Sequence, residues 1–155
     1  MDIRELLRIG KVTQKDPVNM RCRVTFFDTP TSSLTSYWLP VLVTRAFEDT
    51  YYDLPDIGSS VLCAFLPNGH EVGFILGSYY PEGKTPCSDG DIYQHKFKDG
   101  TYLEYDRKSH KLTASCVGDA EVLAGGKVDV VGDDVSIFAK NTLLLQAKQI
   151  IAQEG

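Results

Sequence analysis

The sequence, 155 residues long, lacks any extended hydrophobic run. No apolar stretch approaches the roughly 18 residues that a helix needs to span a bilayer. The N-terminus, Met1 to Leu7, carries an acidic residue at its second position and has no apolar core of the kind found in signal peptides. These two absences predict a protein that is made and folded in the cytoplasm, wherever it later acts.

The chain also lacks an excess of positive charge. It has 16 Lys and Arg against 21 Asp and Glu, which gives a formal net charge of −5 at pH 7. Proteins that bind the phosphate backbone usually carry a basic stripe, so no nucleic-acid partner is predicted. The hydrophobic content of 43% and the charged content of 24% are globular values. They predict one ordinary domain, or a small domain with an appendage.

Motifs that carry chemistry are missing as well. The sequence has no Walker loop, GxSxG elbow, GxGxxG turn, CxxC pair, HxH or HExxH. Glu104 and Asp106 share one face of a predicted strand, but no glycosidase-like cleft is predicted around them. Reduced structural thiols are favoured over a disulfide or a metal site at the four scattered cysteines, Cys22, Cys63, Cys87 and Cys116. We therefore predict no enzymatic activity, no metal site and no cofactor.

The first half of the chain has the pattern of a small β-barrel. A short helix is predicted over residues 1–8, and an OB-fold domain of five strands over residues 9–80. The first of these strands begins at Arg8. Pro67-Asn68-Gly69 is a hairpin signal between the last two strands, because Asn-Gly accepts positive φ. The predicted strands are Arg8–Val12, Arg21–Phe26, Tyr37–Val43, Val61–Leu66 and Val72–Leu76. Five strands in so short a segment predict a barrel of the OB type.

Residues 81–106 are predicted to be a linker and a β-hairpin. Proline and glycine recur up to residue 91, as in a linker. After it, Tyr93–Phe97 and Thr101–Tyr105 flank Asp99-Gly100, which favours a tight turn. Alternation along these two strands predicts an apolar face formed by Tyr93, Phe97, Leu103 and Tyr105.

Residues 107–155 repeat short alternating segments. Their apolar positions recur every 7 to 8 residues, and Phe138 is the only aromatic residue after Asp106. Alternation within so short a period is typical of stacked strands. A ribbon this thin cannot bury its own apolar edge. It therefore needs many coils or partner chains, and the pattern predicts an oligomeric β-helix with a mechanical role.

An ordered series of short segments in this chain matches one known family. These segments are Arg8–Val12, Arg21–Val24, Trp38–Val41, Leu54–Leu62, Val72–Tyr80, Phe97–Asp106 and His110–Thr113. The series resembles the baseplate assembly protein V family, the central spike of contractile-tailed phages and phage-like particles. It resembles more distantly the valine-glycine-repeat spike of type VI secretion. Each segment alone is weak, but the ordered series covers nearly the whole chain.

The resemblance implies an all-β protein with an N-terminal OB-fold barrel and a C-terminal intertwined trimeric β-helix. Some relatives end in an apex where HxH motifs from three chains hold a metal ion. This chain ends Ile150 to Gly155 without that motif, so no apical metal is predicted and a separate spike-tip protein is expected. No lysozyme insertion is present either, so the wall-degrading activity of certain relatives is not expected.

Within such a trimer, alternation along the shaft separates an axial set of side chains from an outer set. Leu123, Phe138 and Leu144 fall at nominally outward positions. They indicate either slips in strand register or a patch that contacts another protein. The axial set is Leu112, Ala114, Cys116, Ala120, Val122, Ala124, Val128, Val130, Val135, Ile137, Ala139, Leu143, Leu145 and Ala147.

The function implied is structural. We expect a rigid homotrimeric rod in a virion or phage-like particle, assembled in the bacterial cytoplasm. It would dock to the tail hub and baseplate proteins and pierce the host cell envelope when the tail contracts. The alternative is an OB-fold nucleic-acid-binding or adaptor module whose tail is a single-chain β-solenoid.

Overall fold

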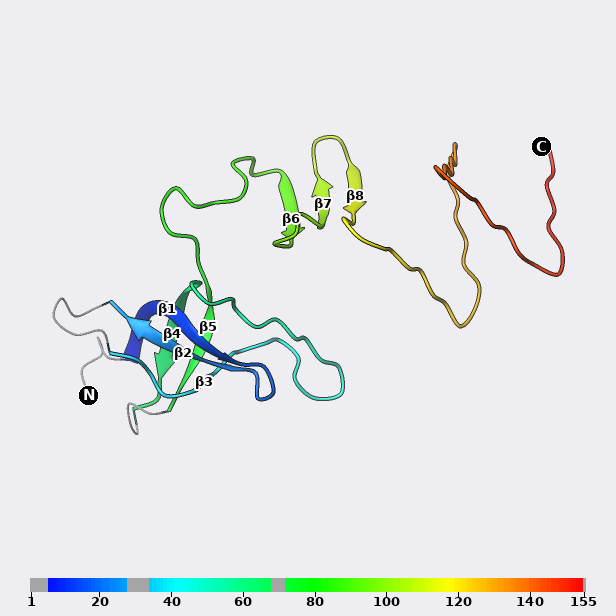
Figure 1. Cartoon of the computed structure of the whole chain (residues 1–155). Helices are drawn as coiled ribbons and strands as arrows, with labels where there is room; N and C mark the ends of the chain where they lie inside the picture. The colour runs from blue at the N-terminus through cyan, green and yellow to red at the C-terminus, as the bar shows by residue number, and fades with distance from the viewer. Residues whose placement is uncertain (1–5, 28–33, 68–71, 155) are drawn as a thin grey trace. The chain divides into compact units, whose positions relative to one another are not determined.

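A computed structural model of the chain describes residues 6–27, 34–67 and 72–154. It divides into two compact units, Met1–Gly90 and Asp91–Gly155. Figure 1 shows five strands in the first unit, and in the second unit three strands followed by a long segment without strands. Each unit is described by itself below.

The first unit is a nearly closed five-stranded sheet. Its strands lie in the order β3-β2-β1-β4-β5, and every neighbouring pair is antiparallel. The two edges approach each other where Val41 bridges Ile75 in parallel and the Leu42 N–H donates to the Ile75 carbonyl at 3.0 Å. The strands are β1 (Leu7–Asp16), β2 (Arg21–Phe26), β3 (Leu39–Pro40), β4 (Ser60–Phe65) and β5 (Gly73–Ser78). This all-β, barrel-like sheet is consistent with the predicted OB fold.

Strand β1 pairs with both β4 and β2. Residues from Leu7 to Lys11 pair with β4, and the strand pairs with β2 from Gly10 onward, with a register shift between Val12 and Gln14. A Cβ atom at Gly10 would lie 2.4 Å from the Thr25 carbonyl oxygen. Only glycine allows that close approach, so Gly10 is required where the sheet curls.

The barrel encloses a core that a single chain completes. The rings of Phe26 and Phe65 meet edge to face with centroids 5.8 Å apart. Leu39, Cys22 and Ile75 are fully buried. Among the described residues, the buried hydrophobic side chains of this core are those of Val12, Cys22, Val24, Phe26, Leu39, Val61, Cys63, Phe65 and Ile75.

The structure corrects two predicted elements. Most of the predicted N-terminal helix lies outside the described residues, as do Asn68-Gly69. Its last two residues are not helical, because β1 already starts at Leu7 and pairs with Ala64. The third predicted strand, Tyr37–Val43, shrinks to Leu39–Pro40, since proline has no N–H to extend the ladder.

The second unit begins with a small antiparallel sheet in the order β6-β7-β8. Its strands are β6 (Ile92–Lys96), β7 (Tyr102–Asp106) and β8 (Lys111–Ser115). The β6–β7 turn contains Gly100 at a φ of 96°, and the Asp99 carboxylate accepts from the Thr101 N–H at 2.8 Å. The predicted hairpin is confirmed, and we call β6-β7-β8 the hairpin sheet.

From residue 116 to residue 154 the structure assigns no strand. This segment, called the tail, runs in extended stretches that reverse direction at bends (Figure 1). The bends fall at residues 117–118, 125–126, 133–134, 140–141 and 148. Their spacing of 7 to 8 residues matches the period of the apolar positions. The predicted β-helix itself is not formed within one chain.

Candidate assembly surface

One face of the hairpin sheet is apolar and exposed. Strand register places its side chains in two rows across the three strands. The rows are Tyr93, Tyr105, Leu112 and His95, Leu103, Ala114. Within the single chain Tyr105 is 37% exposed and Leu112 is 67% exposed. A sheet of three short strands is close to the minimum for independent stability, and an exposed apolar face of this kind is typical of a contact surface.

The opposite face of the hairpin sheet is polar and internally bonded. The Gln94 amide donates to the Glu104 carboxylate at 2.7 Å, and Glu104 lies beside Thr113 in the ladder. Asp106 is the other carboxylate of the pair noted in the sequence. It accepts hydrogen bonds in the turn between β7 and β8. Local structure therefore explains both carboxylates.

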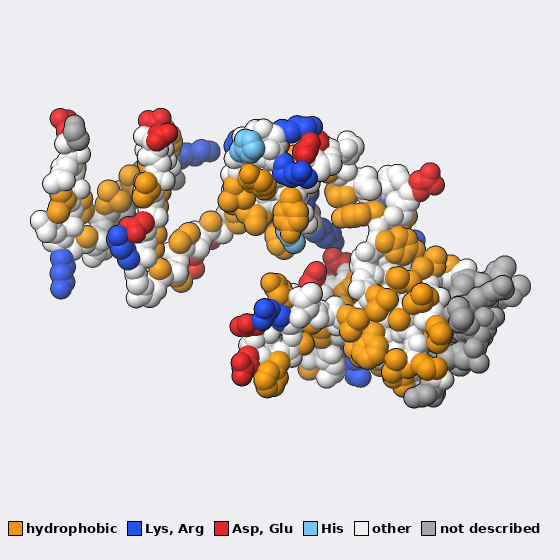
Figure 2. Space-filling model, turned by 180° about the vertical axis from the view of Figure 1, so that it is seen from behind, with side chains coloured by type: hydrophobic (Ala, Val, Ile, Leu, Met, Phe, Trp, Pro, Cys, Tyr) orange, Lys and Arg blue, Asp and Glu red, His pale blue; other side chains and the backbone are white. Residues whose placement is uncertain are grey.

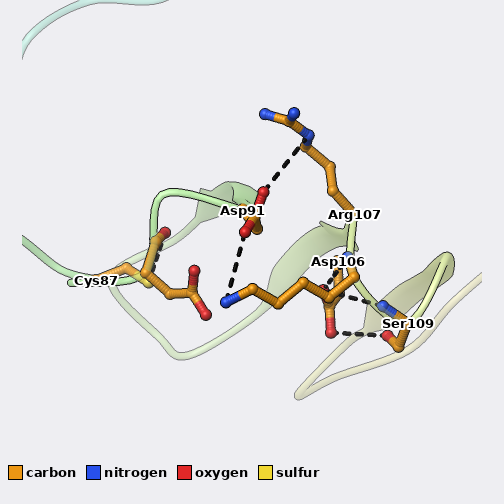
Figure 3. Close-up of polar contacts among 7 residues, drawn as sticks. Cys87, Asp91, Asp106, Arg107 and Ser109 are labelled. Carbon is orange, nitrogen blue, oxygen red and sulfur yellow. Dashed lines mark hydrogen bonds and ion pairs between the residues drawn. The ribbon is translucent and has the colours of Figure 1, made fainter.

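The turn between β7 and β8 is built around Asp106 (Figure 3). Its carboxylate accepts from the Ser109 hydroxyl at 2.7 Å and from the Lys108 N–H at 2.8 Å. These hydrogen bonds lower the pKa of Asp106, and the bond from the Ser109 hydroxyl has the largest effect. Asp91 faces the same turn, 3.4 Å from the Lys108 ammonium and 3.8 Å from the Arg107 guanidinium. These contacts join the residue that precedes β6 to the turn between β7 and β8.

The predicted axial side chains divide into two groups. Leu112 and Ala114 lie on β8, within the apolar face of the hairpin sheet. The other members, from Cys116 to Ala147, lie in the tail, and the structure brings none of them into a core within the described chain. Figure 2 shows hydrophobic side chains spread along the extended stretches instead of gathered into a cluster.

Exposure along the tail follows the predicted division in part. Val135 and Leu143, both predicted to be axial, are 54% and 53% exposed. Phe138 and Leu144, at outward positions, are 92% and 78% exposed. Val122 does not follow the pattern, since it is predicted to be axial and is 85% exposed. All of these side chains remain exposed in the single chain, so their assignment to an axis stays a prediction.

The cysteines also differ between the two units. Cys22 and Cys63 are buried in the barrel, and Cys87 and Cys116 are exposed. Burial raises the pKa of Cys22 and raises that of Cys63 to about 12. All four are free thiols. Among residues 6–27, 34–67 and 72–154, no group of three or more His, Cys, Asp and Glu side chains could hold a metal ion, and no helix is long and apolar enough to cross a bilayer.

Sequence reasoning missed a second apolar surface, on the outside of the barrel. Ile9 and Leu62 are opposite each other on β1 and β4, and Leu76 lies on β5. Ile9 and Leu76 are exposed although their strands also supply the core. The available signal was the run Val61 to Phe65, which is apolar at every position and therefore on both faces of its strand.

Comparison with known proteins gives two findings. Residues 8–80 match the model of a family described as the type VI secretion system/phage-baseplate injector OB domain. The chain is also similar to a curated protein of Escherichia phage P2 that is named "Spike protein". The two are 27% identical over 150 residues, which cover 96% of this chain and 69% of the phage protein.

Proposed function

We propose that the chain is a homotrimeric central spike of the phage baseplate spike family, a proposal supported by the family match over residues 8–80 and by the similarity to the phage P2 protein. Three tails wind into one rigid rod, and the barrels at the other end form a collar that docks to the tail hub. Contraction of the tail drives the rod through the host envelope. The work is mechanical and needs no catalytic group and no cofactor.

The observation that carries this proposal is the state of the tail in a single chain. Its side chains are apolar at regular intervals and exposed, for example Ile137 and Leu145 at 67% and 61%. Its backbone forms no strand ladder from residue 116 to residue 154. Unpaired backbone groups and exposed apolar side chains are both unfavourable. Neighbouring copies of the same ribbon supply both missing partners.

Intertwining makes the rod stiff as well as stable. Burying one Val, Leu or Ile side chain contributes about 1.5–3 kcal/mol, and each axial position is present in three copies. When every extended stretch pairs with stretches of other chains, no edge is left open along the rod. No single stretch can then detach alone. A rod with these properties can transmit force along its length.

The alternative of a single-chain solenoid is not favoured. In a solenoid, successive coils of one chain pair with each other and enclose a core. The described tail has the bends of such coils but neither the pairing nor the core. The net charge of −5 also does not suit a nucleic-acid-binding module.

The test is the mass of the purified chain in solution, measured by light scattering. We expect three times the chain mass of 17.2 kDa, and electron microscopy should show a collar and a rod with three-fold symmetry. A mass of a single chain would contradict the proposal.

A matched pair of variants tests the assigned axis. Ile137→Asp places three carboxylates against each other inside the rod and should abolish the trimer, because buried unpaired charges are strongly unfavourable. Ser136→Asp makes the same charge at the neighbouring, predicted outward position and should leave the trimer intact. Equal effects of both variants would contradict the assigned register.

A further inference from the structure

A groove crosses the outside of the barrel over β1, β4 and β5. It consists of two adjoining cavities that share Ser78 and Tyr79. The first, of about 450 Å³, is lined mainly by apolar side chains, among them Ile9, Leu62 and Leu76. The second, of about 550 Å³, adds two lysines and several hydroxyl groups. Cavities of this size can receive large side chains.

The charged end of this groove is basic. Lys11 and Lys84 line it, and no Asp or Glu belongs to the described lining. Neither lysine forms an ion pair within the described residues. The Lys11 ammonium lies 5.9 Å from the centroid of the Phe27 ring, a contact that leaves its charge without a carboxylate. An apolar trough that ends in two lysines without an ion pair suits a partner that presents aromatic or aliphatic side chains next to carboxylates.

A segment of the same chain has this complementary composition. It is the aromatic loop, which we define as residues 45–53, between β3 and β4. Its tip carries exposed aromatic side chains, with Phe47 at 88% and Tyr52 at 65% exposure. Glu48 and Asp53 lie among them and form no ion pair within the described residues.

Local contacts hold the aromatic loop in shape. The Tyr51 N–H donates to the Arg45 carbonyl at 3.0 Å, and the Arg45 guanidinium pairs with Asp49 at 3.1 Å. The Tyr52 hydroxyl donates to the Pro17 carbonyl at 3.2 Å, next to the turn between β1 and β2. The loop is therefore ordered with its aromatic side chains toward solvent and outside its own groove. A preorganised loop loses little conformational freedom on binding.

We propose that the aromatic loop of one copy binds in the outer groove of the next copy around the three-fold axis. This contact rests on the proposed trimer and adds a second source of assembly, located in the barrels. It joins two different surfaces of each chain. A contact of that kind closes into a ring when the rotation between copies fits, as it does for three copies in a cyclic trimer. The aromatic side chains enter the apolar cavity, and the loop carboxylates face the two lysines.

Cross-linking of paired cysteines in the full-length chain tests the contact. Cys87 and Cys116, the two exposed native thiols, are first replaced by serine. Phe47→Cys and Leu76→Cys are then introduced together, both at exposed positions, and the double variant is treated with a short bismaleimide. We expect a covalent trimer. The two single variants, each alone, should give no cross-link, whereas their co-expressed mixture should give cross-linked dimers.

The outcomes separate this contact from the proposed function. A double variant that is trimeric by light scattering but is not cross-linked would overturn the loop–groove contact and leave the spike proposal standing. A cross-link formed by Phe47→Cys alone would also overturn it, because like surfaces would then meet. A monomeric wild-type chain would overturn both proposals.

Charge reversal gives an independent readout in the same background. Glu48→Lys with Asp53→Lys should reduce the cross-linking yield, since like charges then face each other. Adding Lys11→Glu and Lys84→Glu should restore it. Failure of the second pair to restore a yield lost with the first would contradict the proposed facing of charges.

Discussion

The barrel and the tail differ in how their apolar side chains can be buried. In the barrel, five strands of one chain close on themselves, and nine hydrophobic side chains are buried without help. In the tail, a comparable supply of Val, Leu and Ile side chains stays exposed, and the described residues form no strand. The difference lies in the length of the repeat. A repeat of 7 to 8 residues from bend to bend is too short for one chain to enclose a core. The barrel is specified by one chain, whereas the tail is specified by an assembly.

The largest effect is expected from removing the tail. A chain that ends at Cys116 keeps the barrel and the hairpin sheet but loses most of the proposed axis. We expect the trimer to be lost or strongly weakened at micromolar concentration, as measured by light scattering. Fluorescence of Trp38, the one tryptophan of the chain, should stay unchanged, because the barrel has its own core. An unchanged trimer would contradict the tail as the main source of assembly.

Alkylation of the cysteines distinguishes burial within a chain from burial between chains. Cys63 should be unreactive in any state in which the barrel is folded, since it is buried and its pKa is raised to about 12. Cys116 is exposed in the single chain and predicted to be axial. In the trimer it should react as slowly as Cys63, and Cys87 serves as the accessible control. Mass spectrometry of the labelled peptides measures all three rates. Equal rates for Cys116 and Cys87 in the trimer would contradict the assigned axis.

A core substitution in the barrel should cost stability whether or not the chain is assembled. Ile75 is fully buried and lies where the sheet closes. Ile75→Ala should lower the free energy of unfolding of the barrel by about 2–5 kcal/mol. Denaturant unfolding followed by Trp38 fluorescence measures this loss. Leu144→Ala, at an exposed outward position of the tail, is the matched control. It should change the free energy of unfolding of the barrel by less than about 0.5 kcal/mol. A similar loss in both variants would mean that the two regions unfold as one.

The same comparison explains what the sequence could predict. The sequence predicts four of the five barrel strands near their true positions, because alternating or continuous apolar runs of five to six residues between turn residues are a strong local signal. The third failed at Pro40, where pairing depends on a neighbour that is distant in sequence. The period of the tail was readable and reappears as the spacing of its bends. Its strand pairing was not readable from one chain, since that pairing depends on other copies.

The proposed contact surfaces show a similar limit. The apolar face predicted from alternation comprises Tyr93, Phe97, Leu103 and Tyr105. The register places Tyr93, Leu103 and Tyr105 on that face, whereas Phe97 lies beyond the end of β6. The outer groove of the barrel could not be predicted from alternation. Leu62 and Leu76, which line it, lie on strands whose apolar residues all fit a place in the core. Only the ladder register shows which of them point outward. Inward and outward sides of a strand that is apolar throughout cannot be distinguished by composition.

The smallest effect is expected at the turn between β7 and β8 of the hairpin sheet. The bonds from Ser109 and Lys108 lower the pKa of Asp106 in the folded chain. A lowered folded pKa means that the charged carboxylate stabilises the fold above the ordinary Asp pKa, and that this contribution is lost as the pH falls through the folded value. Asp106→Asn should therefore lower the melting temperature slightly at pH 7, and the difference from wild type should shrink in acid. Glu82→Gln, at an exposed position of the linker, is the control and should have no comparable effect. A difference that persists unchanged in acid would assign the role of Asp106 to its shape instead of its charge.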